Sequence, residues 1–486
     1  MKILSKFLAD RRSWRRAKKV LAGTPWFDAE WYTARSPRAA GDPLGHYCRR
    51  GWQEGLDPSP WFSTRGYLDA HPDVAGAEIN PLLHFVTTGE NEGRWPAGSK
   101  PDENDRFPRA AAWAAQDDAA PEAAIVFLID LVQDVSMLRP LVLMAAEFDL
   151  PIMILVSGRF AFLDHEGTWQ AEIAALAGDT GARVLIFGSA KEAADVLPER
   201  GLIFAASESS APAHALSHAV FVQAPEHLYK VTLQHGFECL GFRHNREHDR
   251  TNGETIHFAA DSVCAWYSRP ALTAFDHGAG TDLCITGPTS LLYHPPAEVR
   301  QLENEADALA PGLIGENLHS VRYLADEGLV EEFVRGISQL AASESRRAIS
   351  VRPHPAGAFI AHHRDRLPNN VLIAAGPLWK IGLERHAYAI CSASSLVIDA
   401  MLAGVPTAIW QDRGGLVDTS AFDGLPKVSD PHEWIAFAQQ ARLHPGEFIS
   451  AQRRWLDALG FVTDPATVRS RFEKLFGAFV AQPKVH

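Results

Sequence analysis

Apolar and polar positions alternate in blocks along most of the chain. From residue 121 onward, apolar runs of strand length are separated by stretches whose apolar residues recur at helical spacing, a pattern typical of βαβ units and a parallel sheet. The first series of predicted strands is 123–129, 152–156, 183–187, 202–205, 231–234, 263–266 and 283–286. The second series is 312–315, 348–351, 371–373, 387–391 and 407–410, and helices are expected near 433–442, 446–459 and 466–476.

This pattern predicts the α/β fold class, with two Rossmann-like domains that face one another across a cleft. A chain of 486 residues exceeds the roughly 250–300 residues that one hydrophobic core serves. We expect an N-terminal domain at 121–290, an interdomain linker rich in Pro and acidic residues at 291–310, and a C-terminal domain at 311–486. In open α/β sheets the ligand lies at the carboxyl ends of the strands, so the loops that follow strands are where chemistry is expected.

The first 20 residues have the pattern of a basic amphipathic helix. They carry eight Lys or Arg side chains and one Asp, within a chain whose formal charge is −13. The apolar residues that fall near one helical face are Ile3, Leu4, Phe7, Leu8, Trp14 and Val20. Two interpretations stay open: the helix lies on an anionic membrane surface with Phe7 and Trp14 as anchors, or it docks its apolar face on the rest of the protein.

Residues 21–97 contain an internal repeat. Trp26-Phe27, Tyr32 and Pro37 recur 35 positions later, and the pattern Pro-Leu-x-His-aromatic, followed by Gly and Glu-Gly, begins at Pro43 and again at Pro81. This indicates two copies of one small helical module. His46 and His84 hold equal positions in the two copies, and we expect them to be packed or hydrogen-bonded. The expected task is binding or positioning a protein partner, and residues 98–120 are predicted to be a linker.

The composition excludes several classes of protein. An acidic chain without a concentrated basic surface argues against nucleic-acid binding. The five cysteines are scattered and show no C-x-x-C spacing, so neither a disulfide framework nor a zinc site is indicated. No apolar run approaches the roughly 18–20 residues of a transmembrane helix, and no signal peptide is predicted. We expect a cytoplasmic protein, with peripheral association at the inner membrane as a hypothesis for residues 1–20.

Three loops that follow predicted strands carry polar residues suited to chemistry. His235-Gly236 follows the strand at 231–234, and the Gly allows close backbone approach. Arg352-Pro353-His354-Pro355 follows 348–351 and offers donors for phosphate oxygens. Ser392–Ser395 precedes a predicted helix whose N-terminus can bind an anion. Singly, the serines are ordinary helix N-caps and the Pro-rich loop is a rigid turn, but the combination favours a ligand site.

This set of motifs resembles the GT-B glycosyltransferases that use CMP- or CDP-activated donors, namely the bacterial sialyltransferase and CDP-glycerol glycerophosphotransferase groups. The repeats likewise resemble modules found beside bacterial surface-polysaccharide glycosyltransferases. The matching pairs are His354-Pro355, Ser394-Ser395 and His235-Gly236. The segment 315–322, which contains His319 and Arg322, resembles the phosphate-side loop of these enzymes. Asp164-His165-Glu166-Gly167 is the nearest match to the acidic acceptor-base motif, with His between the acids.

The resemblance implies a sugar transfer from a nucleotide-activated donor to a glycan, lipid-linked or protein acceptor. The residues expected to bind the donor phosphate and nucleotide are Arg352, His354, Pro355, Ser394, Ser395, His319 and Arg322. For the base that deprotonates the acceptor hydroxyl we favour His235, because the ordinary pKa of about 6.5 lies near working pH. Glu166 and Glu316 compete for this role, and Gly236, Arg243 and His244 are expected to contact the acceptor.

Two alternatives and one metal question remain open at this point. The same loops suit transfer of glycerol phosphate from a CDP donor, and a non-catalytic glycan- or nucleotide-binding scaffold would keep them too. His244 and His248 have the H-x-x-x-H spacing of metal ligands, yet no third ligand follows at a suitable spacing and arginines surround them. We therefore expect a polar loop, no bound metal and no cofactor.

Overall fold

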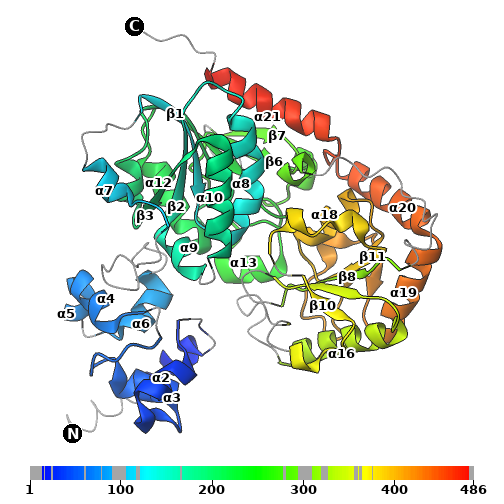
Figure 1. Ribbon diagram of the computed structural model, residues 1–486, viewed down its shortest axis with the longest axis horizontal. Helices are drawn as coiled ribbons and strands as arrows, with labels where there is room; N and C mark the ends of the chain where they lie inside the picture. The colour runs from blue at the N-terminus through cyan, green and yellow to red at the C-terminus, as the bar shows by residue number, and fades with distance from the viewer. Residues whose placement is uncertain are drawn as a thin grey trace.

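The computed structural model shows two parallel sheets with helices on their faces, and a small helical module at the N-terminal end (Figure 1). It describes residues 14–15, 17–22, 24, 26–59, 62–77, 79–89, 106–115, 121–164, 167–276, 281–293, 309–318, 327–354, 360, 364–374 and 376–480. The predicted fold class is confirmed, because both sheets are parallel and each follows a βα repeat.

The first sheet has the strand order β3-β2-β1-β4-β5-β6-β7. Its strands are β1 (Ala123–Ile129), β2 (Ile152–Ser157), β3 (Arg183–Phe187), β4 (Arg200–Ala205), β5 (Leu228–Leu233), β6 (Ser262–Ala265) and β7 (Asp282–Ile285). Its helices are α7 (Ala110–Ala114), α8 (Val132–Ala145), α9 (Gly158–Leu163), α10 (Thr168–Thr180), α11 (Ala190–Ala194), α12 (Ala215–Gln223) and α13 (Arg246–Asn252).

Both faces of this sheet are buried, which explains the unbroken apolar runs in its strands. Ile125 and Phe127 of β1 point to one face, where they pack with α8, α10 and the C-terminal helix. Val126 and Leu128 point to the other face, where they pack with residues of α7, α11 and α12. Alternate side chains of β1 therefore belong to two separate hydrophobic cores, one on each face of the sheet.

The second sheet has the order β10-β9-β8-β11-β12-β13. Its strands are β8 (Gly312–Gly315), β9 (Ile349–Arg352), β10 (Val371–Ile373), β11 (Tyr388–Cys391), β12 (Thr407–Trp410) and β13 (Lys427–Val428), the last of which was not predicted. Its helices are α16 (Glu327–Ser343), α18 (Ser395–Leu402), α19 (Pro431–Leu443) and α20 (Pro445–Ala458). The central strands β9, β8 and β11 are neighbours, so the residues that follow them meet at one edge of the sheet.

The last helix, α21 (Pro465–Val480), returns to the first half of the chain (Figure 1). Val468, Phe472 and Phe476 are fully buried in the core that the first sheet forms with α8 and α10. The predicted C-terminal domain of 311–486 thus contains a helix that packs on the other domain. Sequence periodicity shows that α21 is amphipathic, but it does not show which sheet the apolar face covers.

The N-terminal module has its own aromatic core. Its elements are α2 (Ala29–Arg35), η1 (Pro37–Ala39), α3 (Pro43–His46), η2 (Tyr47–Gly51), α4 (Thr64–Ala70), α5 (Pro72–Gly76), α6 (Pro81–His84) and η3 (Phe85–Gly89). Tyr32 is hydrogen-bonded to Nδ1 of His46 at 2.8 Å, and Tyr67 is bonded in the same way to His84 at 3.0 Å. Both histidines are thus hydrogen-bonded inside the module, as expected.

The described part of the N-terminal helix docks on this module. Ala17 and Leu21 are buried in the same core, and Trp14 packs against it beneath the guanidinium of Arg49, 4.8 Å from the ring centroid. The expected membrane anchor Trp14 is therefore used within the protein, which favours the docking interpretation for residues 14–21. Phe7 and the rest of 1–13 lie outside the described residues. No described helix is long and apolar enough to cross a bilayer.

Candidate functional site

The residues that follow β8, β9 and β11 form one hydrogen-bonded group. The Oε1 atom of Glu316 accepts from the backbone N–H of Leu318 at 2.5 Å, and Oε2 accepts from the N–H of His354 at 3.3 Å. The side-chain amide of Asn317 donates to the carbonyl oxygen of Ala393 at 2.6 Å. These bonds hold the three strand ends together, so that His354 and the start of α18 lie at a common edge.

Glu316 is better suited to holding this edge than to acting as a base. It is 3% exposed, and both carboxylate oxygens accept backbone hydrogen bonds. Burial raises the pKa of this carboxyl, and the backbone hydrogen bonds partly offset the increase. A proton acceptor must reach the acceptor hydroxyl, and Glu316 is turned inward. We therefore do not carry Glu316 forward as the base.

Arg352 is likewise engaged by the protein. Its Nη1 donates to the carbonyl oxygens of Gly376 at 2.8 Å and Ala374 at 3.5 Å, both beyond the end of β10. Burial lowers the pKa of Arg352 to about 10, so the guanidinium is still charged near neutral pH. Arg352 thus ties the ends of β9 and β10 together and contributes positive charge to the edge. Its expected contact with a donor phosphate stays a prediction.

The N-terminus of α18 has the features of an anion site. Ser394 occupies the N-cap position, but its side chain makes no capping hydrogen bond, contrary to the ordinary-cap interpretation. Two fully buried polar atoms beside it, Oγ of Ser392 and Oδ1 of Asn317, have no hydrogen-bond partner among the described residues. Unpaired buried polar atoms are costly and rare, and a bound ligand is one way in which their pairing is completed. Together with the backbone N–H groups of the helix, they suit a phosphate.

His235, at the end of β5, is oriented by the backbone. Its Nδ1–H donates to the carbonyl oxygen of Ala206 at 3.0 Å, which leaves Nε2 as the unprotonated nitrogen. The sulfur of Cys239 lies 3.2 Å from Nδ1, and the ring of His214 stands nearly perpendicular at 5.1 Å. Burial lowers the pKa of His235 to about 4, whereas the sequence suggested an ordinary value of about 6.5. The imidazole is therefore neutral near pH 7 and can accept a proton.

The loop of His235 meets the start of α18 across the domain boundary. The backbone N–H of Phe237 donates to Oγ of Ser395 at 3.3 Å. A Cβ atom on Gly236 would lie 2.9 Å from that same oxygen, so a larger residue here would displace the hydroxyl of Ser395. The structure thus brings together the His-Gly pair and the Ser-Ser pair, which are about 160 positions apart in the sequence.

The predicted acceptor loop has two different parts. The guanidinium of Arg243 lies over the ring of Phe237, with 4.8 Å to the centroid, and is half-buried beside the His235 loop. His244 is exposed, and its Nδ1 lies 3.1 Å from the carboxylate of Asp249. Arg246 donates to the carbonyl oxygens of Gly415 and Leu416 in the other domain. Arg243 therefore borders the candidate site, while His244 faces solvent.

Several predicted residues lie outside the described part of the chain. These are Glu166, His319, Arg322 and Pro355. The neighbouring Asp164 is buried, and its Oδ2 accepts from the backbone N–H of Gln170 at 2.7 Å. Among the described residues, no group of three or more His, Cys, Asp or Glu side chains is placed to hold a metal ion.

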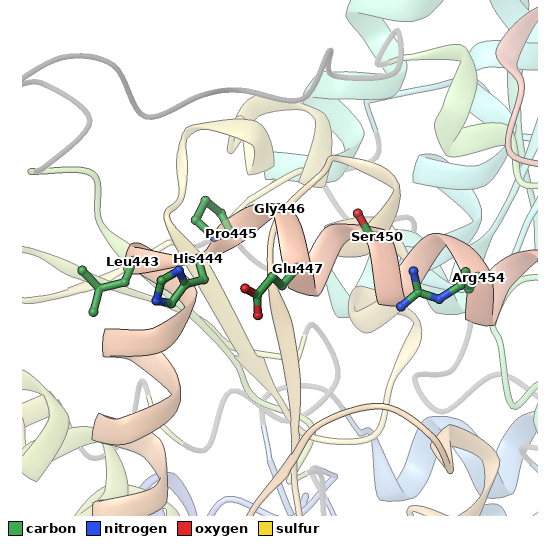
Figure 2. A pocket seen from close by; sticks show the side chains of 7 residues that line it. All are labelled: Leu443, His444, Pro445, Gly446, Glu447, Ser450 and Arg454. Carbon is green, nitrogen blue, oxygen red and sulfur yellow. The ribbon is translucent and has the colours of Figure 1, made fainter.

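An open depression on the surface is separate from the strand-end residues. Figure 2 shows it along α20, lined by residues that include His444, Glu447, Ser450 and Arg454. None of the residues assigned to the donor or acceptor side lines it. We therefore do not connect it with the candidate site.

Sequence reasoning missed a polar group at the same edge of the first sheet. Asp134 is buried and accepts from Oγ of Ser207 at 2.6 Å and from the backbone N–H of Asp130 at 2.9 Å. Asp134 thus joins the ends of β1 and β4 through Ser207, which directly follows Ala206, the residue whose carbonyl orients His235. Asp130 directly follows the first predicted strand, and this position was the available signal.

Comparisons with known proteins support the fold. No protein-family profile and no curated protein matches the sequence. A protein described as a UDP-N-acetylglucosamine 2-epimerase of Listeria monocytogenes has a similar structure, with 11% identity, a TM-score of 0.50, and coverage of 75% of this chain and 98% of that one. S. aureus MnaA, solved with UDP, gives 11% identity, a TM-score of 0.50, and coverage of 74% and 97%.

A third similar structure is the calicheamicin glycosyltransferase CalG4, with 13% identity, a TM-score of 0.43, and coverage of 74% of this chain and 100% of that chain. At these identities the likeness concerns the fold alone. The chain has the GT-B arrangement of two Rossmann-like domains. The narrower resemblance to the CDP-glycerol and sialyltransferase groups stays a prediction.

Proposed function

We propose that this protein is a glycosyltransferase that moves a sugar from a nucleotide-activated donor to a glycan, lipid-linked or protein acceptor. The observation that carries the proposal is the contact of the His235–Phe237 loop with the start of α18. This contact supports the proposal because the loop that carries the neutral imidazole of His235 meets the helix start that we assign to the leaving phosphate. Glycosyl transfer needs this pair: a base for the acceptor hydroxyl and a site that stabilises the leaving phosphate.

The leaving phosphate is assigned to the C-terminal domain. Its negative charge would be met by the N–H groups at the start of α18, the hydroxyls of Ser392 and Ser394, and His354. Glu316 and Asn317 hold the loops that carry these groups. Fixed donors need no reorganisation when the charge develops, which is the main source of electrostatic catalysis.

His235 is the residue to which we assign the role of the base that takes the proton of the acceptor hydroxyl. The carbonyl of Ala206 fixes the protonated nitrogen, so Nε2 carries the lone pair that takes the proton. Because burial lowers the pKa of His235 to about 4, the base form dominates at neutral pH. A base of low pKa is a weaker proton acceptor, so its contribution depends on the developing negative charge of the leaving group nearby.

We further propose which nucleotide activates the donor sugar. The His-Pro and Ser-Ser pairs favour CMP- or CDP-activated donors, as in the families that these motifs resemble. A UDP complex is known for one protein of similar fold. The test is a thermal-shift screen with CMP, CDP, UDP and GDP, each paired with its nucleoside, because a ligand that binds the native state raises the melting temperature. A shift with nucleotides but not with nucleosides supports a phosphate site, and no shift with any nucleotide contradicts it.

The biological setting that we infer is synthesis of a bacterial surface polysaccharide or glycoconjugate. The two-copy module supports this proposal through its resemblance to modules found beside such enzymes, and it offers a surface for a protein partner. Since Trp14 is packed on the module, a membrane contact would rest on the basic residues before it. Co-sedimentation of the full chain and of a chain lacking residues 1–13 with anionic vesicles tests this point.

A further inference from the structure

A buried ion pair lies at the carboxyl edge of the first sheet. Asp130 directly follows β1, and Arg159 lies on α9, directly after the adjacent strand β2. Nη2 of Arg159 is 2.7 Å from Oδ2 of Asp130. The Asp130 side chain is 0% exposed, whereas the Arg159 side chain is 16% exposed. The carboxylate is thus fixed inside the protein, and part of the Arg159 side chain is exposed.

Contacts along the edge lead from this pair to His235. Nη2 of Arg159 also donates to the carbonyl oxygen of Ala213 at 3.3 Å. The next residue, His214, is buried and bonded through Nδ1 to Oγ of Ser209 at 2.7 Å. Its ring stands at 81° to that of His235. The guanidinium thus contacts the residue before His214, and the ring of His214 lies against that of His235.

Asp130 keeps an unused acceptor. Its Oδ1 atom is buried and has no hydrogen-bond partner among the described residues. A buried carboxylate oxygen without a partner is costly, since its hydration is lost and nothing replaces it. Because Oδ2 is held by Arg159, Oδ1 is the atom left to accept a hydrogen bond from a hydroxyl group.

The charges of the described residues at this edge argue against an anionic group as the natural occupant. The charge of Arg159 is balanced by Asp130 at 2.7 Å. Burial holds the pKa of His214 well below its usual value, so this imidazole is neutral at pH 7. Among the described residues, the Asp130–Arg159 pair carries no net charge, and Oδ1 would repel a phosphate or carboxylate. A hydroxyl group fits, because it donates to a carboxylate oxygen and accepts from a guanidinium at the same time.

We propose that the Asp130–Arg159 pair binds hydroxyl groups of an uncharged sugar or polyol acceptor and places it beside His235. The assignment rests on the proposed glycosyltransferase function. It makes Asp130 and Arg159 the residues that select the acceptor, with Asp130 also holding Arg159 in place. The part of the acceptor that enters the site is uncharged, whatever carrier is attached further away.

The test uses the full chain with glycerol, N-acetylglucosamine and glycerol 3-phosphate as probes in ligand-observed saturation-transfer NMR. We expect the wild type to bind at least one of the uncharged probes, and Arg159→Lys to weaken that binding roughly tenfold, as expected from the loss of a paired contact. Asp130→Asn leaves Arg159 with an unbalanced charge, so its preference should move toward glycerol 3-phosphate. A merely structural pair would not produce this reversal.

Asp195→Asn is the matched control, because it removes the acid of an exposed pair with Lys191. Nucleotide binding is measured on the same samples by thermal shift. If nucleotides bind but neither uncharged probe does, or if both variants bind the probes as the wild type does, the acceptor assignment is overturned and the glycosyltransferase proposal is untouched. If no nucleotide binds, the glycosyltransferase proposal fails, and the acceptor role fails with it.

Discussion

The backbone N–H of Phe237 donates to the side-chain oxygen of Ser395 at 3.3 Å, and this bond joins the two Rossmann-like halves at their facing edges. It connects the loop of the proposed base to the first residue of α18, where the leaving phosphate is assigned. The distance between the proposed base and the proposed phosphate site thus depends on a close approach that Gly236 permits.

Replacing Gly236 by Ala should disturb this approach. The new methyl group would lie 2.9 Å from Oγ of Ser395, so the hydroxyl must rotate and lose its bond to Phe237. We expect a stability loss of about 1 kcal/mol and a decrease in turnover of roughly tenfold. In a chain that already carries Ser395→Ala, Gly236→Ala should lower turnover less, because the oxygen with which the new methyl group clashes is no longer present. A double-mutant cycle on kcat measures this coupling.

Gly178→Ala is the control for that cycle. Gly178 lies inside α10, and nothing lies within 4 Å of an added Cβ atom. The substitution should leave turnover unchanged and stabilise the helix by about 0.5–1 kcal/mol. Additive effects of the Gly236 and Ser395 substitutions would show that the two residues are not coupled.

The pH dependence of turnover should reflect the lowered pKa of His235. A base is active when unprotonated, so kcat/KM should stay level as pH falls through 6.5 and decline only as it approaches about 4. His235→Gln should lower kcat by about 10²–10⁴-fold and remove this limb of the profile. A profile that declines near pH 6.5 in the wild type would contradict the buried, neutral imidazole.

The stability of the protein should respond to acid through His214. Burial lowers the folded-state pKa of His214 well below the unfolded value of about 6.5. Between these values the unfolded chain binds more protons, so this contribution to the free energy of unfolding is lost as pH falls below about 6.5. In His214→Asn the stability should fall less steeply with acid than in the wild type. Denaturant unfolding at pH 7, 6 and 5 measures the slopes, and equal slopes would refute the assignment.

The histidines of the N-terminal module should behave as a matched pair. Tyr32→Phe and Tyr67→Phe each remove one tyrosine–histidine hydrogen bond, at 2.8 and 3.0 Å in the native module. Each should destabilise the module by about 1 kcal/mol. Hydrogen exchange of peptides from residues 26–89 measures the local opening without requiring the whole chain to unfold in one step. Very different effects of the two substitutions would contradict structural equivalence.

The fold follows from the sequence because both faces of each sheet are buried and the strands therefore appear as unbroken apolar runs. The strand β13, of two residues, is too short to give such a signal. The destination of α21 is not predicted either, since its apolar face shows that it packs but not on which domain. The sequence also leaves the two interpretations of Trp14 open, because an aromatic residue on an amphipathic helix fits a protein core and a membrane surface equally well; the packing of Trp14 on the module favours docking.

The sequence predicts which loops form the candidate site, but it does not predict how the individual side chains in these loops are oriented or bonded. His235 and Ser395 are found because they follow strands, and parallel strands end at a common edge. The inward orientation of Glu316 and the carbonyl contacts of Arg352 depend on tertiary packing, which no local pattern reports. Asp130 and Arg159 were missed because each is a single charged residue until β1 and β2 place them together.

The most direct test of the central claim is calorimetric titration of the nucleotides into the wild type, Ser392→Ala and Ser394→Ala. The Ser394 side chain makes no capping bond to α18, and Oγ of Ser392 has no partner among the described residues, so both variants should be at least as stable as the wild type. We expect at least one nucleoside phosphate to bind the wild type, with affinity about 5- to 50-fold lower in each variant, as for lost hydrogen bonds to a charged group. Ser450→Ala, an exposed position on α20, should bind as the wild type does. Equal affinities in all four proteins, or no binding to the wild type, would contradict a donor-phosphate site at this helix.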